Sequence, residues 1–143
     1  MRTSSILWVV LVLGCGAAAK PNYHPGPTPA PGLTQAQLHD ASVKVLARAG
    51  FSLRESVPAA GLTSSEWVVV GDAWSGQRYH SWRILASDGE LEVLIDCRDQ
   101  DGTNPPTPCP AGERHEKWIT RVPDLRQLIL DEAKRRQSAA TSP

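Results

Sequence analysis

A hairpin pattern in the middle of the chain constrains the fold more than any other feature. Residues 79–86 and 91–97 both alternate along their length, and the pair Asp88-Gly89 lies between them. Asp-Gly is typical of a two-residue hairpin turn, so the two segments are predicted to pair as antiparallel strands with one buried face. The residues predicted to share a face are His80, Trp82, Ile84 and Ala86 in the first strand and Leu91, Val93, Ile95 and Cys97 in the second.

Two helices are predicted, one before and one after the strands. Thr34 and Gln37 form a capping box for the first helix, and Gly50 ends it. Pro123 is a suitable first residue for the second helix, with Asp124 favourably placed at its amino end. The stripes at helical spacing are Leu38, Ala41, Val45, Leu46 and Ala49 in the first helix and Leu125, Leu128, Ile129 and Glu132 in the second.

Further strands complete a single domain. Residues 51–57 alternate as a half-buried strand, residues 58–61 form a turn, and residues 62–70 form one continuous strand. Residues 117–120 add a short strand around Trp118. The predicted fold class is α+β: a single antiparallel sheet of four to five strands flanked by an N-terminal and a C-terminal helix, both packed on one face. The domain is expected to cover residues 34–137, and residues 138–143 are expected to form a disordered tail.

The segment before the domain is rich in proline. Residues 20–32 read KPNYHPGPTPAPG, with prolines at positions 21, 25, 27, 29 and 31. Because each proline lacks an N–H and fixes φ, a helix or a central strand is excluded, and an extended polyproline II spacer is favoured. Residues 15–33 are therefore assigned to a linker. A proline-rich recognition ligand is the alternative, with Tyr23 and His24 as its distinctive side chains.

The amino terminus has the pattern of an export signal. Arg2 precedes an unbroken apolar run at residues 6–13, and small residues follow. As a helix this run would span about 12 Å, far less than the ~30 Å hydrocarbon core of a bilayer. The pattern therefore predicts a secretory signal peptide instead of a transmembrane helix. An ordinary signal peptide would be cleaved near residues 17–19, which are all alanine.

The tetrapeptide VLGC at residues 12–15 resembles the lipobox of bacterial lipoproteins. The resemblance implies that residues 1–14 are removed and that Cys15 becomes an acylated amino terminus, with a diacylglyceryl thioether and commonly a third chain. More than one acyl chain is needed for stable anchoring. Gly16 follows the cysteine, and in enterobacterial lipoproteins the absence of aspartate there favours the outer membrane. The expected location is the bacterial cell envelope, with the domain facing the periplasm or the cell surface.

The other two cysteines, Cys97 and Cys109, are predicted to pair. Export places them in an oxidising compartment, and they enclose a polar loop that could not hold itself together by packing. A closed loop of this length stabilises a domain by roughly 3 kcal/mol in the chain-entropy model. A zinc site with His115 as third ligand is an alternative, although the spacing fits no compact zinc pattern. Calcium binding by residues 96–102 is disfavoured because Cys97 replaces the first acid of an EF-hand loop. No metal or cofactor is expected.

Charge and motifs argue against nucleic-acid binding and catalysis. Fifteen Lys and Arg residues balance fifteen Asp and Glu residues, so the basic excess typical of nucleic-acid partners is missing. The sequence contains no nucleophile elbow, no phosphate-binding glycine loop and no H-E-x-x-H helix. A hydrolase site at His80 or His115 is the least favoured hypothesis, and the chain is expected not to be an enzyme.

Residues 47–67, ARAGFSLRESVPAAGLTSSEW, resemble the small repeat domains of envelope lipoproteins such as BamC, in which a helix leads into a strand, a turn and a second strand. The resemblance implies a helix-grip α+β unit without catalytic activity. We expect the domain to bind another envelope component through its sheet or through a loop that carries Trp74. The alternative is a small-ligand module with a pocket between the sheet and the C-terminal helix, near Trp67, Trp82 and Trp118.

Overall fold

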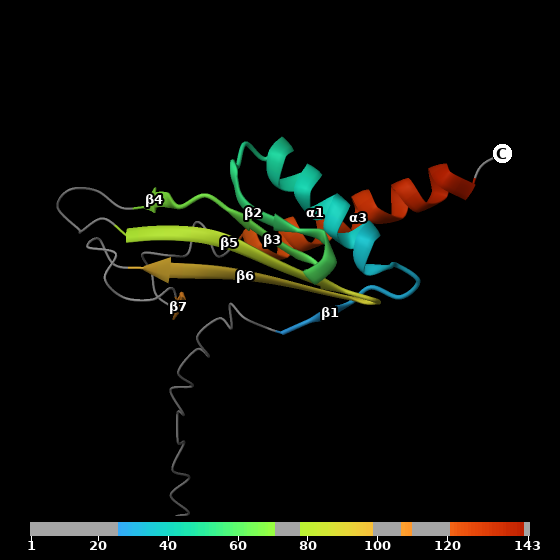
Figure 1. The fold of residues 1–143 in the computed structure, drawn as a ribbon, viewed down its shortest axis with the longest axis horizontal. Helices are drawn as coiled ribbons and strands as arrows, with labels where there is room; N and C mark the ends of the chain where they lie inside the picture. The colour runs from blue at the N-terminus through green and yellow to red at the C-terminus, as the bar shows by residue number, and fades with distance from the viewer. Residues whose placement is uncertain (1–25, 71–77, 99–106, 110–120, 142–143) are drawn as a thin grey trace, which may run out of the picture.

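The computed structural model describes residues 26–70, 78–98, 107–109 and 121–141 (Figure 1). The strands in these ranges are β1 (Thr28–Pro29), β2 (Leu53–Val57), β3 (Leu62–Ser65), β4 (Val68–Val70), β5 (Arg78–Ser87), β6 (Glu90–Arg98) and β7 (Thr107–Pro108). The helices are α1 (Gln35–Arg48), the short 3-10 helix η1 (Pro58–Ala60) and α3 (Arg121–Thr141). The predicted strand at residues 117–120 lies outside the described residues.

The strands form one antiparallel sheet, which confirms the predicted α+β class. Five of them follow the order β1-β6-β5-β3-β2, while β4 pairs with β5 and β7 pairs with β6. The central hairpin of β5 and β6 is also confirmed: its turn is Asp88-Gly89, and Gly89 adopts a left-handed φ of 76°, which costs glycine little. His80 faces Cys97 and Ala86 faces Leu91 across the hairpin, so the alternating residues of both strands share one face.

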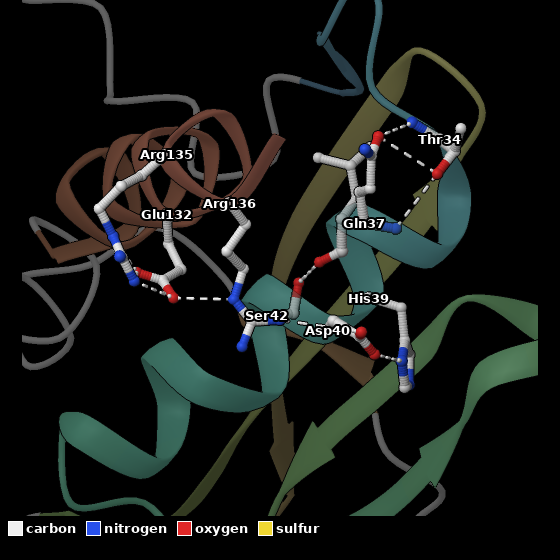
Figure 2. Close-up of polar contacts among 9 residues, drawn as sticks. Thr34, Gln37, His39, Asp40, Ser42, Glu132, Arg135 and Arg136 are labelled. Atoms are coloured by element: carbon white, nitrogen blue, oxygen red, sulfur yellow. Dashed lines mark hydrogen bonds and ion pairs between the residues drawn. The ribbon is translucent and has the colours of Figure 1, made fainter. Parts of the chain in front are cut away.

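Both α-helices lie side by side on that face of the sheet (Figure 1). α1 begins with the predicted capping box, in which the Gln37 side chain accepts the N–H of Thr34 at 2.9 Å and the Thr34 hydroxyl accepts the N–H of Gln37 (Figure 2). The core lies between the helices and the sheet. Its largest fully buried apolar members are Leu38, Leu46, Ile84, Leu91, Val93, Ile95 and Ile129. Neither helix of the described ranges has the length and hydropathy needed to cross a membrane.

A buried carboxylate joins the two helices (Figure 2). Glu132 of α3 accepts hydrogen bonds from Arg135 at 2.9 Å, from Arg136 at 3.0 Å and from Arg48 of α1 at 3.0 Å. The hydrogen bond from Arg135 is the main cause that holds the pKa of the Glu132 carboxyl below its usual range, and Arg48 adds to it, although burial opposes both. Arg136 also lies 3.8 Å from Asp40 of α1. The sequence predicted Glu132 on the inner stripe, and these cations explain how a charge is tolerated there.

α3 differs from its prediction in the face that it buries. Leu128, predicted on the inner stripe, is 54% exposed, and Leu130 lies in the core instead. The other buried apolar side chains of α3 are Leu125, Ile129 and Ala133. Both stripes fit a period of 3.6 residues, so the sequence pattern left the rotation of the helix open, and packing against α1 and β6 decides it.

α3 is also longer than predicted. It begins at Arg121 and continues to Thr141, so residues 138–141, expected to be disordered, are helical. These residues include two alanines and no helix breaker, and alanine is the strongest helix former. The Gln137 side chain donates a hydrogen bond to the carbonyl of Gly32 at 2.8 Å, which ties this end of the helix to the start of the domain.

The domain begins earlier than the predicted boundary at Thr34. β1 pairs with β6, and both Ala30 and Leu33 are buried in the core. The N–H of Ala30 bonds to the carbonyl of Gly89 at 2.7 Å, and the N–H of Gly89 bonds to the carbonyl of Leu33 at 2.9 Å. The last part of the predicted linker is thus an edge strand, a position in which Pro29 is tolerated.

Candidate functional site

A β-bulge interrupts the strand that the sequence predicted as continuous over residues 62–70. β3 and β4 both pair with β5, but Ser64 faces Arg83 whereas Val68 faces His80, so one extra residue lies between the two pairings. The polar groups at the break are satisfied locally. The Ser65 hydroxyl accepts the N–H of Trp82 at 2.9 Å, and the Ser65 carbonyl accepts a hydrogen bond from the Ser81 hydroxyl at 2.7 Å.

The extra residue determines which side of the sheet Trp67 occupies. In an unbroken strand Trp67 would share the inner face with Thr63, which faces Ile84, because side chains alternate with a period of two. The bulge instead places Trp67 on the outer face, the one turned away from the helices. There it meets Arg98, whose partner across the hairpin is Tyr79.

Two arginines stack on the outer-face aromatic rings. The guanidinium carbon of Arg54 lies 4.9 Å from the centre of the Trp67 ring, and that of Arg98 lies 4.7 Å from the same ring and 5.1 Å from the Tyr79 ring. These distances are typical of cation–π contacts. We call Arg54, Trp67, Tyr79 and Arg98 the cation–aromatic patch. Val69, which faces Tyr79 on β4 and β5, is 46% exposed beside it.

The patch carries positive charge without a carboxylate partner in the described ranges. Among the described residues, Arg54 donates a hydrogen bond only to the Ser64 hydroxyl, at a long distance of 3.4 Å. A neighbouring arginine on the same face, Arg83, is different, because it forms a 3.0 Å ion pair with the buried Asp96. No ion pair of the described residues involves Arg54 or Arg98. Arginine and aromatic side chains are the residues enriched at the energetic centres of protein interfaces.

The predicted tryptophan pocket is not formed by Trp67 and Trp82. Trp82 is buried in the core on the inner face and contacts Phe51 edge to face, with ring centres 6.2 Å apart. Trp67 lies on the opposite face of the sheet, so the two rings cannot line one cavity. The structural reason is the bulge, which the sequence did not predict. Trp118 and the predicted contact Trp74 lie outside the described residues, as does Cys15.

The two remaining cysteines form the predicted disulfide, Cys97–Cys109. Cys109 directly follows β7, and its N–H donates to the carbonyl of Ile95 at 3.0 Å. Both cysteines are buried as part of the core. The bridge therefore attaches the end of β7 to β6.

Among the described histidines, His39 comes nearest to a catalytic arrangement. Its Nε2 lies 3.2 Å from the hydroxyl of Ser56, and its Nδ1 lies 3.7 Å from Oδ1 of Asp40. This is the order of groups in a serine hydrolase, but 3.7 Å is too long for the hydrogen bond that orients the imidazole. We therefore assign these residues to the contact between α1 and β2. His80 is buried beside the disulfide, and His24 and His115 lie outside the described residues.

Comparisons with known proteins identify no family. No protein-family model matches the sequence, and neither does any curated protein. Among solved structures, a DUF4468 family protein from Bacteroides ovatus is similar over 82% of this chain and 85% of that chain, with 16% identity and a TM-score of 0.37. A TBP-like protein from Parabacteroides distasonis is similar over 76% of this chain and 90% of that chain, with 12% identity and a TM-score of 0.44. Likenesses of this size carry no argument about function.

Proposed function

We propose that this chain is a membrane-anchored envelope lipoprotein whose α+β domain binds another envelope protein and catalyses no reaction. In this proposal Cys15 carries the acyl chains, and residues 16–27 form the spacer between the membrane and β1. An extended spacer of this length reaches roughly 37 Å at about 3.1 Å per residue. The location that fits the lipobox resemblance and Gly16 is the outer membrane, with the domain facing the periplasm or the cell surface.

The cation–aromatic patch is the observation that carries the binding proposal. Two guanidinium groups held over the Trp67 ring are positioned before any partner arrives, which lowers the entropy cost of binding. They are not neutralised by a carboxylate of the described residues, so a partner that presents acidic side chains would complement them. Val69 supplies exposed apolar surface next to the charges. Trp74 stays a predicted additional contact.

The small-ligand alternative is less well supported. Its predicted pocket required Trp67 and Trp82 on the same side of the sheet, and the bulge separates them. Trp82 instead packs against Phe51 within the core. We therefore propose the outer face of the sheet as the binding surface, instead of the space between the sheet and α3.

The anchor is tested by Cys15→Ser in cells that express the full chain. We expect the variant to lose incorporation of labelled fatty acid and to leave the membrane fraction. The double variant Cys97→Ser/Cys109→Ser is the control and should keep its label, because neither of these cysteines is an acylation site. Fatty-acid labelling of the Cys15→Ser chain would contradict the anchor.

The patch is tested by the double variant Arg54→Gln/Arg98→Gln. Its control is Lys44→Gln/Lys134→Gln, which removes the same charge from exposed positions on the two helices. A photo-crosslinking amino acid at Val69 reports contact with a partner in cells. We expect the arginine variant to lose the crosslinked product and the lysine variant to keep it. Equal yields from both variants would show that the patch does not bind the partner.

A further inference from the structure

Three potential metal ligands gather at one end of the core. His80 on β5 faces Cys97 on β6 across the hairpin, and Cys109 directly follows β7. The ligand atoms of these three side chains all lie within 4.8 Å of one another. His80 is 3% exposed, and both cysteines are also buried. His80 and Cys97 lie on paired strands, and the N–H of Cys109 bonds to the carbonyl of Ile95 on β6, so the three backbones are held in place.

The imidazole supplies the nitrogen ligand of this cluster. His80 lies on the inner face of β5, directly opposite Cys97 in the hairpin register. An imidazole next to two sulfurs has a clear use once the sulfurs are thiolates, because two Cys and one His form a known ligand set for zinc.

We propose that the reduced domain binds Zn²⁺ through the Cys97 and Cys109 thiolates and the imidazole of His80. At Zn–S bonds of about 2.3 Å and Zn–N bonds of about 2.0 Å, two sulfurs and one nitrogen around a tetrahedral ion lie roughly 3.5–3.8 Å apart. The three ligand atoms lie within 4.8 Å of one another, so after the disulfide is cleaved the sulfurs must move apart and the imidazole must move closer to them. No further His, Cys, Asp or Glu of the described residues joins the cluster, so the described residues supply three of the four ligands of a tetrahedral site.

The reaction that opens the site is a two-electron reduction. A dithiol reductant attacks the disulfide, is itself oxidised to a disulfide, and leaves Cys97 and Cys109 as thiols. Zn²⁺ then displaces their two protons to solvent and accepts one electron pair from each sulfur and one from His80. The metal closes the same loop that the disulfide closed. Zinc binding and disulfide formation therefore exclude each other, and the domain keeps this crosslink in both redox states.

The site is tested on the full chain carrying Cys15→Ser, which leaves Cys97 and Cys109 as the only thiols. The protein is reduced with a phosphine, freed of excess reagent without oxygen, and titrated with Co²⁺ as a spectroscopic substitute for zinc. We expect thiolate-to-cobalt charge-transfer absorption that saturates at one equivalent and is bleached by Zn²⁺. The oxidised protein should show none. A reduced protein without this absorption would overturn the proposal.

The role of His80 is tested by His80→Gln, with His39→Gln as the control because His39 is equally buried but lies on α1. Loss of the imidazole should weaken metal binding at least tenfold, because even the outer-shell partners of metal ligands contribute about 10- to 100-fold to affinity. The control should leave it unchanged. Equal metal affinities in the two variants would mean that His80 is not a ligand, and this result would overturn the proposal.

A second measurement needs no substitution at His80. The reduced chain is loaded with ¹¹³Cd²⁺ and its histidines are labelled with ¹⁵N. Scalar coupling between cadmium and an imidazole nitrogen of His80 supports the proposal. A cadmium signal with sulfur ligands alone contradicts it, even if the glutamine variant does not fold.

Discussion

Replacing Gly61 with alanine should destabilise the domain far more than the same change at Gly50. Both glycines have positive φ, 63° at Gly61 and 83° at Gly50, so both alanines enter the left-handed region. The difference lies in the space around them. A Cβ at Gly61 would lie 1.9 Å from the carbonyl oxygen of Ala86 on β5, whereas a Cβ at Gly50 would meet nothing within 4 Å.

The magnitude follows from these two environments. A left-handed alanine costs about 1–2 kcal/mol, partly offset by about 0.4–1 kcal/mol from the stiffer unfolded chain, so Gly50→Ala should cost about 1 kcal/mol. At Gly61 the backbones must separate by about 1.5 Å to reach ordinary contact. That movement breaks the 2.9 Å hydrogen bond from the N–H of Ala86 to the carbonyl of Gly61. Overpacking and the lost hydrogen bond add about 1–3 kcal/mol each, so Gly61→Ala should cost roughly 3–7 kcal/mol in all.

The assay is urea unfolding followed by tryptophan fluorescence. The midpoint should fall slightly for Gly50→Ala and strongly for Gly61→Ala, with similar slopes if both chains unfold in two states. Gly89→Ala is a second control, since its Cβ also meets nothing within 4 Å. Equal losses at Gly61 and Gly50 would refute the close approach of this turn to β5, and with it the described pairing of β3 and β5.

Two further predictions concern Glu132 and the two described tryptophans. Because Arg135 and Arg48 hold the pKa of the Glu132 carboxyl below its usual range, its contribution to stability is present above the ordinary value of about 4.3 and is lost as the pH falls through the lowered value. Glu132→Gln should therefore lower the melting temperature at neutral pH and matter progressively less in acid; a constant deficit down to pH 3 would contradict this. Trp82→Ala should cost about 3–5 kcal/mol of unfolding free energy as a core truncation, whereas Trp67→Ala should cost about 1–2 kcal/mol, the value of two cation–π contacts. Urea midpoints measure both, and equal costs would mean that the two rings do not lie on opposite faces.

Local patterns in the sequence were sufficient to predict the hairpin and the start of α1. The turn at Asp88-Gly89 depends on residues adjacent in sequence, and so does the capping box of Thr34 and Gln37. The same hairpin register would also have placed Tyr79 opposite Arg98, which is half of the cation–aromatic patch. Tyr79 and Arg98 lie the same number of residues before and after the turn, so an antiparallel hairpin pairs them.

The rest of the patch depends on contacts that no local pattern encodes. At the bulge beside Trp67, the carbonyl of Ser65 accepts a hydrogen bond from the hydroxyl of Ser81, and these two residues lie 16 positions apart in the chain. Nothing within residues 62–70 marks an extra residue, and a slip of one residue moves a side chain to the opposite face. Arg54 reaches the patch because the pairing of β2 with β3 has a second register shift between Leu53 and Glu55.

The central claim, that the outer face of the sheet is where a partner binds, is tested most directly by crosslinking from two matched positions. Val69 is 46% exposed next to the patch, and Leu128 is 54% exposed on α3. A photo-crosslinking amino acid at each position, in the otherwise unaltered chain and in cells, gives two apolar reporters of similar exposure. The account predicts a discrete protein adduct from Val69 and none from Leu128. An adduct from Leu128 alone, or the same adduct in equal yield from both, would contradict it.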